Sequence, residues 1–185
     1  MSRGYDVVVA GGGIAGLSAA LAAARLGCRT LVLAGDVPGG NLLAIEKVEG
    51  YPGFPEGVAG YDLCPMAQEM AAAAGAELET LPLVRVEGEA PALRLFTPDD
   101  EFTGKSLIVA TGASPKALRV PGEERLKGRG VSHCASCDGP LLRDAVVAVV
   151  GGGDSALQES LTLAAVASRV VGLCRGPALA GQASY

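Results

Sequence analysis

The sequence predicts an α/β fold in which two units of strand, glycine-rich turn, helix and parallel strand follow one another. Short β-branched runs end in glycines at residues 5–10 and again at residues 145–150, and such runs are typical of strands buried in a parallel sheet. An Ala- and Leu-rich segment follows each run, as expected of a helix. Hydrophobic residues make up 49% of the 185 residues, so the chain can bury a core and is not intrinsically disordered.

The first unit is expected to continue with a loop, a second helix and several short strands. Gly27 follows the first helical segment, in the position that commonly ends a helix. Residues 36–60 are rich in Gly and Pro and are expected to form an ordered loop. We expect strands at residues 5–10, 29–33, 77–81, 83–87, 93–97, 101–103 and 106–110, and helices at residues 14–26 and 63–74.

A second unit is expected after a boundary at residues 114–121, because residues 113–130 combine prolines, glycines and mixed charges. The opening pattern of the chain then returns. We expect a strand at residues 145–150, a helix at residues 154–168 and a strand at residues 169–173. This internal repeat is the main feature of the chain's organisation.

Composition excludes several classes of function. Lys and Arg number 15 against 20 Asp and Glu, a net charge of −5, and aromatic residues are 4%, so neither a basic surface nor a stacking platform for nucleic acid is expected. Three glycines interrupt the apolar run at residues 7–24, which argues against a membrane span or a secretory signal. Of the five cysteines, only Cys134 and Cys137 lie close together, a pattern typical of a cytoplasmic chain with one special pair.

The turn after the first strand carries a nucleotide-binding pattern, G-x-G-x-x-G, at Gly11, Gly13 and Gly16. The first glycine of this pattern permits a tight turn, the second lets a pyrophosphate approach the backbone, and the third lets the helix pack closely on the strand. An acidic residue should follow the second strand and hold the ribose. Ala34 stands there instead, with Asp36 two residues later.

The turn after the repeated strand carries a related pattern, G-x-G-x-x-A, at Gly151, Gly153 and Ala156. It also lies between an expected strand and an expected helix, the context in which the pattern is meaningful. Two such turns in one chain predict two nucleotide cofactors.

Between the two turns lies a C-x-x-C spacing, Cys134 to Cys137, followed by Asp138. Two sulfurs at this spacing can form a disulfide that closes a small loop, and the neighbouring carboxylate could transfer a proton during thiol exchange. Half of a zinc site and two unrelated buried cysteines are the alternatives; no further His or Cys lies at zinc spacing, so no metal is expected. His133, the only histidine, could stabilise a thiolate or point elsewhere.

Taken together, these motifs resemble the low-molecular-weight thioredoxin reductases. The resemblance runs from Tyr5 to about Leu173, through YDVVVAGGGIAGLSAALAAARLG, PGGN, VEGYPGFPEG, ATGAS, GRGVSHCASCDG and VAVVGGGDSAL. It implies a Rossmann-like FAD-binding domain at residues 1–116, followed at residues 117–185 by an incomplete Rossmann-like domain that binds NADPH or NADH and carries the redox cysteines. It also implies a cytoplasmic homodimer that reduces thioredoxin or a similar protein.

The resemblance gives roles to individual residues. Cys137 would face the flavin, Cys134 would attack the substrate disulfide, and Asp138 would act as general acid. The implied FAD-binding residues are Gly11, Gly13, Ile14, Ala15, Gly16, Asp36, Gly39, Gly40, Asn41, Thr111 and Gly112, and the implied nicotinamide-nucleotide residues are Gly151, Gly153, Asp154, Ser155, Ala156 and Arg175.

The chain departs from the family pattern at several positions. Asn41 replaces the usual Gln, and Gly50 stands where the family has an Asn that contacts the flavin. Of the arginines that grip the 2′-phosphate of NADPH, Arg175 remains and Ala180 occupies the last position, which predicts little preference for NADPH over NADH. The family also continues beyond residue 185, so we expect a fragment, a truncated product or a reduced relative that holds FAD weakly alone.

Two other functions are compatible with the same residues. One is a dithiol oxidase of this fold, in which the flavin passes electrons to oxygen without a nicotinamide nucleotide; the reduced set of phosphate-binding arginines favours it, and the second glycine turn opposes it. The other is a truncated, non-catalytic relative that binds a partner or a nucleotide.

Overall fold

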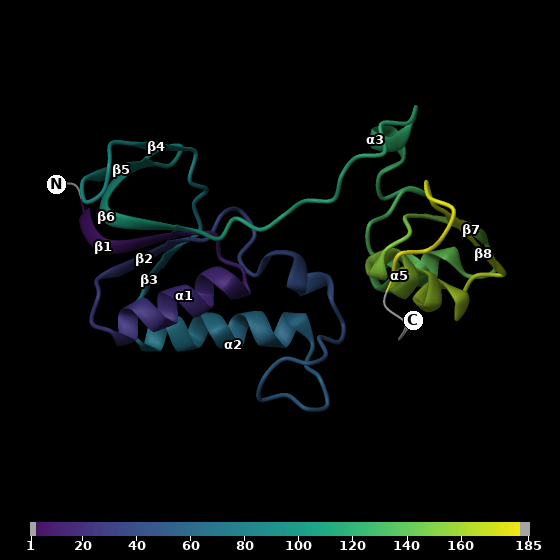
Figure 1. The fold of residues 1–185 in the computed structure, drawn as a ribbon, viewed down its shortest axis with the longest axis horizontal. Coiled ribbons are helices and arrows are strands. Elements are labelled where there is room, and N and C mark those ends of the chain that lie inside the picture. Colours follow the sequence, from purple (N-terminus) through teal and green to yellow (C-terminus); the bar gives the residue numbers. More distant parts are fainter. Residues whose placement is uncertain (1–2, 182–185) are drawn as a thin grey trace. The chain divides into compact units, whose positions relative to one another are not determined.

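The computed structural model describes residues 3–181 and has the expected α/β class (Figure 1). The chain divides into two compact units, one ending at Ala113 and the other beginning at Ser114. Each unit has its own sheet, of six strands in the first and two in the second. Each therefore presents its own glycine-rich turn at the end of a strand.

The sheet of the first unit has the strand order β3-β2-β1-β6-β5-β4. Strands β3, β2, β1 and β6 are parallel, and β5 and β4 continue the sheet in antiparallel fashion. The strands are β1 (Arg3–Ala10), β2 (Thr30–Leu33), β3 (Glu77–Glu79), β4 (Arg85–Glu87), β5 (Leu93–Phe96) and β6 (Glu101–Val109). Because β1 lies between β2 and β6, the turns that follow these three parallel strands meet at one edge of the sheet.

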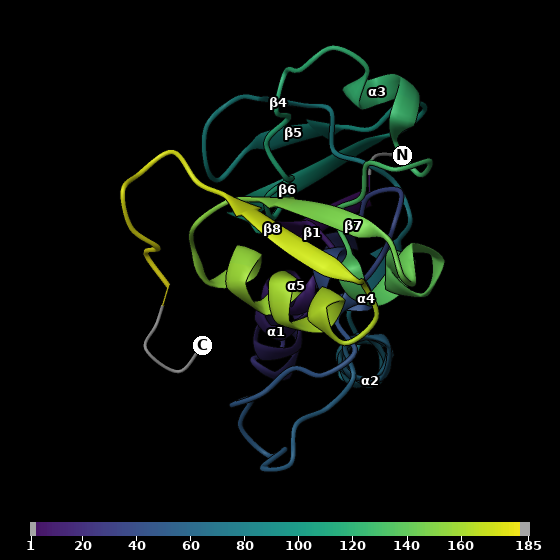
Figure 2. The ribbon, with the colours of Figure 1, turned by 90° about the vertical axis from the view of Figure 1, so that its right-hand side faces the viewer.

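Two helices, α1 (Ile14–Arg25) and α2 (Gly60–Ala73), lie side by side against one face of this sheet (Figures 1 and 2). Strand β2 is buried along its whole length, as expected of a central strand covered on both faces. On the helix side, Val9 and Val32 pack with alanines of α1 and α2. On the other side, Val8 and Leu31 pack with residues of β5 and β6. The core of this unit thus fixes the position of the first glycine turn.

The prediction of two strands at residues 101–103 and 106–110 was wrong, because β6 is one continuous strand. Gly104, which falls between the two expected strands, lies inside it. A Cβ at Gly104 would come within 2.9 Å of a methyl group of Val8 and 3.3 Å of one of Leu95. Gly104 therefore allows close packing within a strand and does not interrupt it.

The segment expected to be irregular contains a short 3-10 helix, η1 (Gly40–Ala44), and α2 begins at Gly60, earlier than expected. A Cβ at Gly60 would lie 1.7 Å from the Leu42 carbonyl oxygen, so the start of α2 packs directly on η1. The turn that carries Gly39 and Asn41 is therefore supported by contact with the start of α2.

The second unit is smaller. It contains α3 (Glu123–Leu126), α4 (Ala135–Asp138), the 3-10 helix η2 (Gly139–Leu142), β7 (Val146–Val150), α5 (Asp154–Ala164) and β8 (Arg169–Leu173). Strands β7 and β8 are parallel, and α5 connects them as predicted but ends at Ala164, before residue 168. The short helices α3, α4 and η2 lie in segments for which no regular structure was expected. Within residues 3–181, no helix has both the length and the apolar character needed to cross a membrane.

Candidate functional site

At the carboxyl edge of the first sheet, backbone hydrogen bonds join the ends of three parallel strands. The Gly11 N–H donates to the Leu33 oxygen at 2.8 Å, and the Ala110 N–H donates to the Ala10 oxygen at 2.8 Å. The first glycine turn, the end of β2 and the segment after β6 are thus held together. This is the edge at which open α/β sheets bind ligands.

The three glycines of the first turn differ in whether packing requires them. Gly11 has φ +115°, and a Cβ there would lie 2.1 Å from the Ala110 oxygen; a Cβ at Gly16 would lie 2.0 Å from the Gly11 oxygen. Packing alone therefore requires these two. Gly13 has an ordinary φ of −79°, and the nearest atom to a Cβ there is the Gly39 oxygen at 4.0 Å. The space at Gly13 lies at the start of α1, where backbone N–H groups attract an anion.

The loop at residues 39–41 lies against this turn. The Gly39 N–H donates to the Gly12 oxygen at 2.8 Å, and the Asn41 side-chain amide donates to the Ala113 oxygen at 2.7 Å. The structure therefore brings together the glycine turn, this loop and the segment that contains Thr111 and Gly112. All of these were singled out in the sequence as candidates for one cofactor.

Cys64 supports the same loop from α2, a role that the sequence did not reveal. Its thiol is buried and donates to the Gly39 oxygen at 3.4 Å. Burial raises the pKa of the Cys64 thiol above its ordinary value, so the sulfur stays protonated and remains a donor. Asp36, the candidate ribose ligand, is exposed beyond Ala34 at the same edge.

In the glycine turn of the second unit, as in the first, packing requires one glycine and leaves open space at another. Gly151 has φ +150°, and a Cβ there would lie 2.8 Å from the Ala156 Cβ, so packing against α5 requires a small residue at each position. Gly153 has φ −98°, and a Cβ there would meet no atom within 4 Å. The second turn therefore also leaves space at the start of a helix, the feature expected of a dinucleotide site.

The segment after β8 lies against this second turn. The Gly151 N–H donates to the Leu173 oxygen at 2.9 Å, and the Ala180 N–H donates to the Gly152 oxygen at 2.6 Å. Arg175 is exposed two residues beyond the end of β8. It occupies the sequence position at which a Rossmann-type fold contacts the ribose of a nucleotide.

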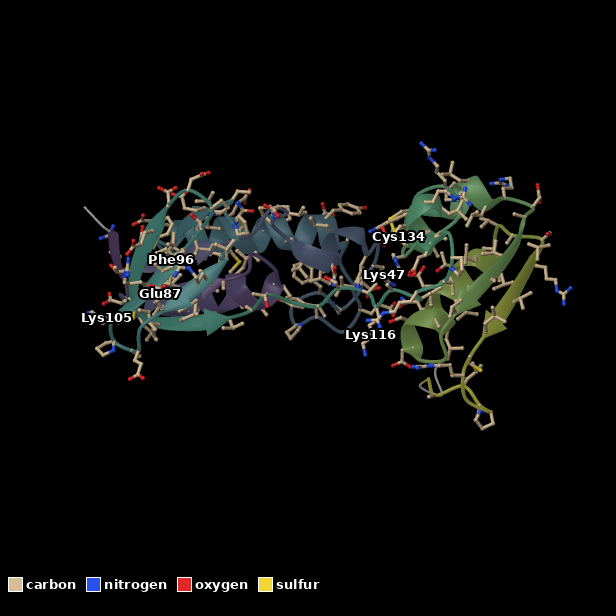
Figure 3. All side chains as sticks on the ribbon, turned by 90° about the horizontal axis from the view of Figure 1, so that it is seen from above. Lys47, Glu87, Phe96, Lys105, Lys116 and Cys134 are labelled. Atoms are coloured by element: carbon tan, nitrogen blue, oxygen red, sulfur yellow. A yellow bond between two sulfur atoms is a disulfide. The ribbon has the colours of Figure 1, made fainter. Side chains whose placement is uncertain are left out.

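Cys134 and Cys137 form a disulfide, with their Cα atoms 5.3 Å apart (Figure 3). This bond is the one predicted from their spacing. Among the described residues no cluster of three or more His, Cys, Asp or Glu could hold a metal ion.

The two cysteines differ in their surroundings. Cys134 is half-buried and precedes α4, and its sulfur accepts the Cys137 N–H at 3.1 Å; Cys137 is exposed. The Asp138 N–H donates to the Cys134 carbonyl oxygen at 3.1 Å, which closes the helical turn. The sulfur of Cys134 is therefore held by a hydrogen bond from within its own helical turn.

The redox turn packs on α5, the helix that begins at the second glycine turn. Ala135 and Leu163 are buried between α4 and α5, and the Glu159 carboxylate accepts the Ala135 N–H. Glu159 was not among the residues singled out in the sequence. Only its place in the helix after the glycine turn could have drawn attention to it.

A small pocket of about 80 Å³ lies beside His133 and is also lined by Glu123 and Lys127. The Glu123 carboxylate accepts the backbone N–H groups of Leu118 at 2.8 Å and Arg119 at 2.7 Å. The pKa of Glu123 is lowered, chiefly by the Leu118 N–H and further by other backbone N–H groups and the charge of His133, against an opposing effect of burial. This contact orders the segment before the redox turn.

Two glycine turns with open space at a helix start, together with a disulfide packed on one of those helices, define a class of protein. The family model of the pyridine nucleotide-disulphide oxidoreductases matches residues 5–184, and the chain belongs to that family. Within it, the chain is similar to thioredoxin reductases. It is 38% identical to the thioredoxin reductase of Treponema pallidum over 182 residues, and 42% identical to that of Mycolicibacterium smegmatis over 166 residues.

Solved structures agree with this assignment. Thioredoxin reductase from Lactococcus lactis superposes with a TM-score of 0.90 at 39% identity, and that from T. acidophilum with a TM-score of 0.87 at 31% identity. These alignments cover 97% and 100% of this chain, but 59% and 60% of those chains. The alignments with the Treponema and Mycolicibacterium proteins cover 98% and 90% of this chain. They cover 59% and 53% of those proteins, so the chain spans little more than half of the length of these relatives.

Proposed function

We propose that the chain carries the redox centre of a thioredoxin-disulfide reductase. In this reaction an electron pair from NADPH or NADH passes through FAD and the Cys134–Cys137 disulfide to thioredoxin or a similar protein. The observation that carries the proposal is the disulfide turn, α4, packed on the helix that starts at the second glycine turn. A disulfide so close to a nucleotide-binding helix is suited to reduction by a nucleotide-derived electron pair.

We assign the two cofactors to the two glycine turns. FAD fits the first turn, with Gly13 leaving room for the pyrophosphate and the 39–41 loop and Thr111–Gly112 beside it. NADPH or NADH fits the second turn at Gly153, with Arg175 toward the ribose. In this proposal residues 1–116 form the flavin domain and residues 117–185 belong to the nicotinamide-nucleotide domain.

The sulfur chemistry then follows from the two cysteines. FAD bound at the first turn would supply the relay of an electron pair from the nicotinamide to the disulfide. With two protons, that pair opens the S–S bond to two thiols. Deprotonated Cys134 attacks the disulfide of thioredoxin and forms a mixed disulfide, with Asp138 providing the proton to the leaving sulfur. Cys137 then attacks the Cys134 sulfur, which restores the internal disulfide and releases reduced thioredoxin.

We choose thioredoxin as the substrate because the similar proteins are named thioredoxin reductases. We further propose that the protein is cytoplasmic and homodimeric. The test is reduction of oxidised thioredoxin by NADPH with added FAD, followed through the new thioredoxin thiols. We expect Cys134→Ser and Cys137→Ser each to abolish this reduction, while Cys28→Ser leaves it unchanged. Thioredoxin reduction that persists in either single variant of the pair would contradict the proposal.

A second candidate function is a dithiol oxidase that uses oxygen in place of a nicotinamide nucleotide. The observation that favours it is the segment after β8, where exposed Arg175 is followed by Gly176 and Pro177 and not by further basic residues. This function predicts that a peptide dithiol bleaches the flavin colour and that oxygen is consumed, with no effect of added NADPH or NADH.

A further inference from the structure

The backbone of the redox turn is held by hydrogen bonds from its own segment and from α5. Inside the segment, the Cys134 N–H donates to the Ser132 hydroxyl at 3.0 Å, and the Cys137 N–H donates to the Cys134 sulfur at 3.1 Å. The Ala135 N–H donates to the carboxylate of Glu159, which lies 24 positions further along the chain in α5. This hydrogen bond joins the residue next to Cys134 to the nucleotide-binding helix.

Such a contact matters because α4 is a single helical turn, Ala135–Asp138. A turn of this length is not stable by itself, since helix nucleation costs more than one turn of hydrogen bonds returns. Its shape therefore depends on the Cys134–Cys137 disulfide and on what the turn packs against. Leu163 follows Glu159 by four positions, so both lie on the same face of α5, and that face meets the buried Ala135. Glu159 adds a directional hydrogen bond to this apolar contact.

We propose that Glu159 is the positioning residue of the redox-active turn. Its carboxylate fixes the Ala135 amide, and with it the turn that holds the two sulfurs, and its negative charge opposes the formation of a thiolate on Cys134. The proposal deepens the proposed function, because it requires that Cys134 cycles between disulfide and thiol.

His133 and Asp138 belong to the segment of Cys134, Glu159 accepts the N–H of the next residue, Ala135, from α5, and η2 (Gly139–Leu142) contributes no titratable side chain. A negative charge next to a thiol raises its pKa, whereas the N–H donated by Cys137 lowers it. Glu159 thus keeps the acidity of Cys134 moderate. A thiol whose pKa lies near the working pH attacks disulfides fastest, because a very acidic thiol is a weaker nucleophile.

Two substitutions separate the two roles. Glu159→Gln keeps an oxygen that accepts the Ala135 N–H and removes the charge, whereas Glu159→Ala removes both. Glu124→Gln is the matched control, because Glu124 is an exposed glutamate in the same unit. Circular dichroism establishes that each variant is folded; Glu159→Gln retains the hydrogen bond and carries the test of the charge even if Glu159→Ala does not fold.

The first measurement is hydrogen exchange of the Ala135 amide in the oxidised chain. We expect exchange to be about tenfold faster in Glu159→Ala, because the amide loses its acceptor, and close to the parent rate in Glu159→Gln and Glu124→Gln. Unchanged exchange in folded Glu159→Ala would overturn the positioning role. This measurement needs neither cofactor nor substrate.

The second measurement is the pH dependence of Cys134 alkylation in the reduced chain, resolved from the other cysteines by peptide mass spectrometry. We expect the midpoint to fall by about half a pH unit in Glu159→Gln and in Glu159→Ala, and to stay in place in Glu124→Gln. A midpoint that does not move in Glu159→Gln would overturn the role of the charge. A Cys134–Cys137 bond that mild reductants fail to open would instead contradict the proposed function. The exchange of the Ala135 amide would still test the positioning role of Glu159, because it is measured in the oxidised chain.

Discussion

The glycines of the two nucleotide-binding patterns separate into those that the fold needs and those that a ligand needs. A Cβ at Gly16 would overlap the Gly11 oxygen, and Gly151 has both a left-handed φ and a close neighbour. Gly13 and Gly153 have neither constraint. Packing therefore does not require glycine at these two positions, and the proposed phosphate sites would.

This difference predicts opposite results for two alanine substitutions in one turn. Gly13→Ala should leave the free energy of unfolding within about 0.5 kcal/mol of the parent, because the new methyl group enters open space, and should weaken FAD binding about tenfold or more. Gly16→Ala should lower the free energy of unfolding by about 3 kcal/mol through overpacking. Urea unfolding and flavin fluorescence titration measure the two quantities. A destabilised Gly13→Ala with unchanged FAD affinity would contradict this interpretation.

Glu123 predicts a dependence of stability on acid. Its pKa is lowered below the ordinary 4.5, first by the Leu118 N–H, so the folded chain releases a proton that the unfolded chain retains. The stabilisation is therefore complete above about pH 4.5 and is lost as the pH falls through the folded-state pKa. We expect the urea midpoint of the second unit to fall more steeply on acidification in the parent chain than in Glu123→Gln, with Glu124→Gln behaving like the parent. Equal acid sensitivity in the parent chain and in Glu123→Gln would refute the contribution of the Glu123 carboxylate to stability.

Among the elements, the loop at residues 39–41 depends on contacts with distant segments. Asn41 reaches Ala113, 72 positions away, and Cys64 reaches Gly39 from α2. These contacts fix a loop whose regular structure is the start of the short 3-10 helix η1. The Asn41 contact also joins the two segments that the proposed flavin site requires.

The Asn41 contact can be tested with a substitution of the same size. Asn41→Asp removes the donor and places a carboxylate oxygen against the Ala113 carbonyl, so we expect a loss of about 1 kcal/mol in FAD binding, or about fivefold in affinity. Asn41→Gln, which keeps a donor, should lose less. Flavin titration of the three chains gives the order. An Asn41→Asp chain that binds FAD as tightly as the parent would show that the contact does not support the site.

The sequence predicted those elements whose signal is local. The β-branched runs, the glycine turns and the C-x-x-C disulfide are each encoded within a few residues, and they appear at the expected positions. Strand β6 was wrongly divided in two because sequence alone does not show that Gly104 packs against Val8 inside a continuous strand. The contacts of Glu159 and Asn41 could not be predicted, because they join residues 24 and 72 positions apart and depend on how helices and loops pack.

At the scale of the whole molecule, the two units differ in how much apolar surface they bury. In the described part of the chain, the buried hydrophobic residues of the second unit are Ala135 and Leu163, whereas β1 and β2 of the first unit hold a fully buried set. Several large residues of the second unit, such as Val146 at 70% and Leu161 at 60% exposure, face solvent. Since burial is the main stabilising contribution to folding, the second unit is the less stable of the two.

We therefore expect the isolated chain to unfold in two steps. Amides of β7, α5 and β8 should exchange through openings of lower free energy than amides of β1 and β2. Hydrogen exchange at increasing urea concentrations, followed by mass spectrometry, resolves the two sets. A single transition shared by both sets of amides would show that the units unfold together.

We propose that electrons from a nicotinamide nucleotide reach the Cys134–Cys137 disulfide. The most direct test is to incubate the oxidised chain with FAD and NADPH without oxygen, and then to alkylate and weigh the peptide that contains both cysteines. The account predicts that both sulfurs become labelled, that NADH acts nearly as well as NADPH, and that omission of FAD prevents labelling. A disulfide that dithiothreitol opens but that FAD with either nucleotide leaves intact would contradict it.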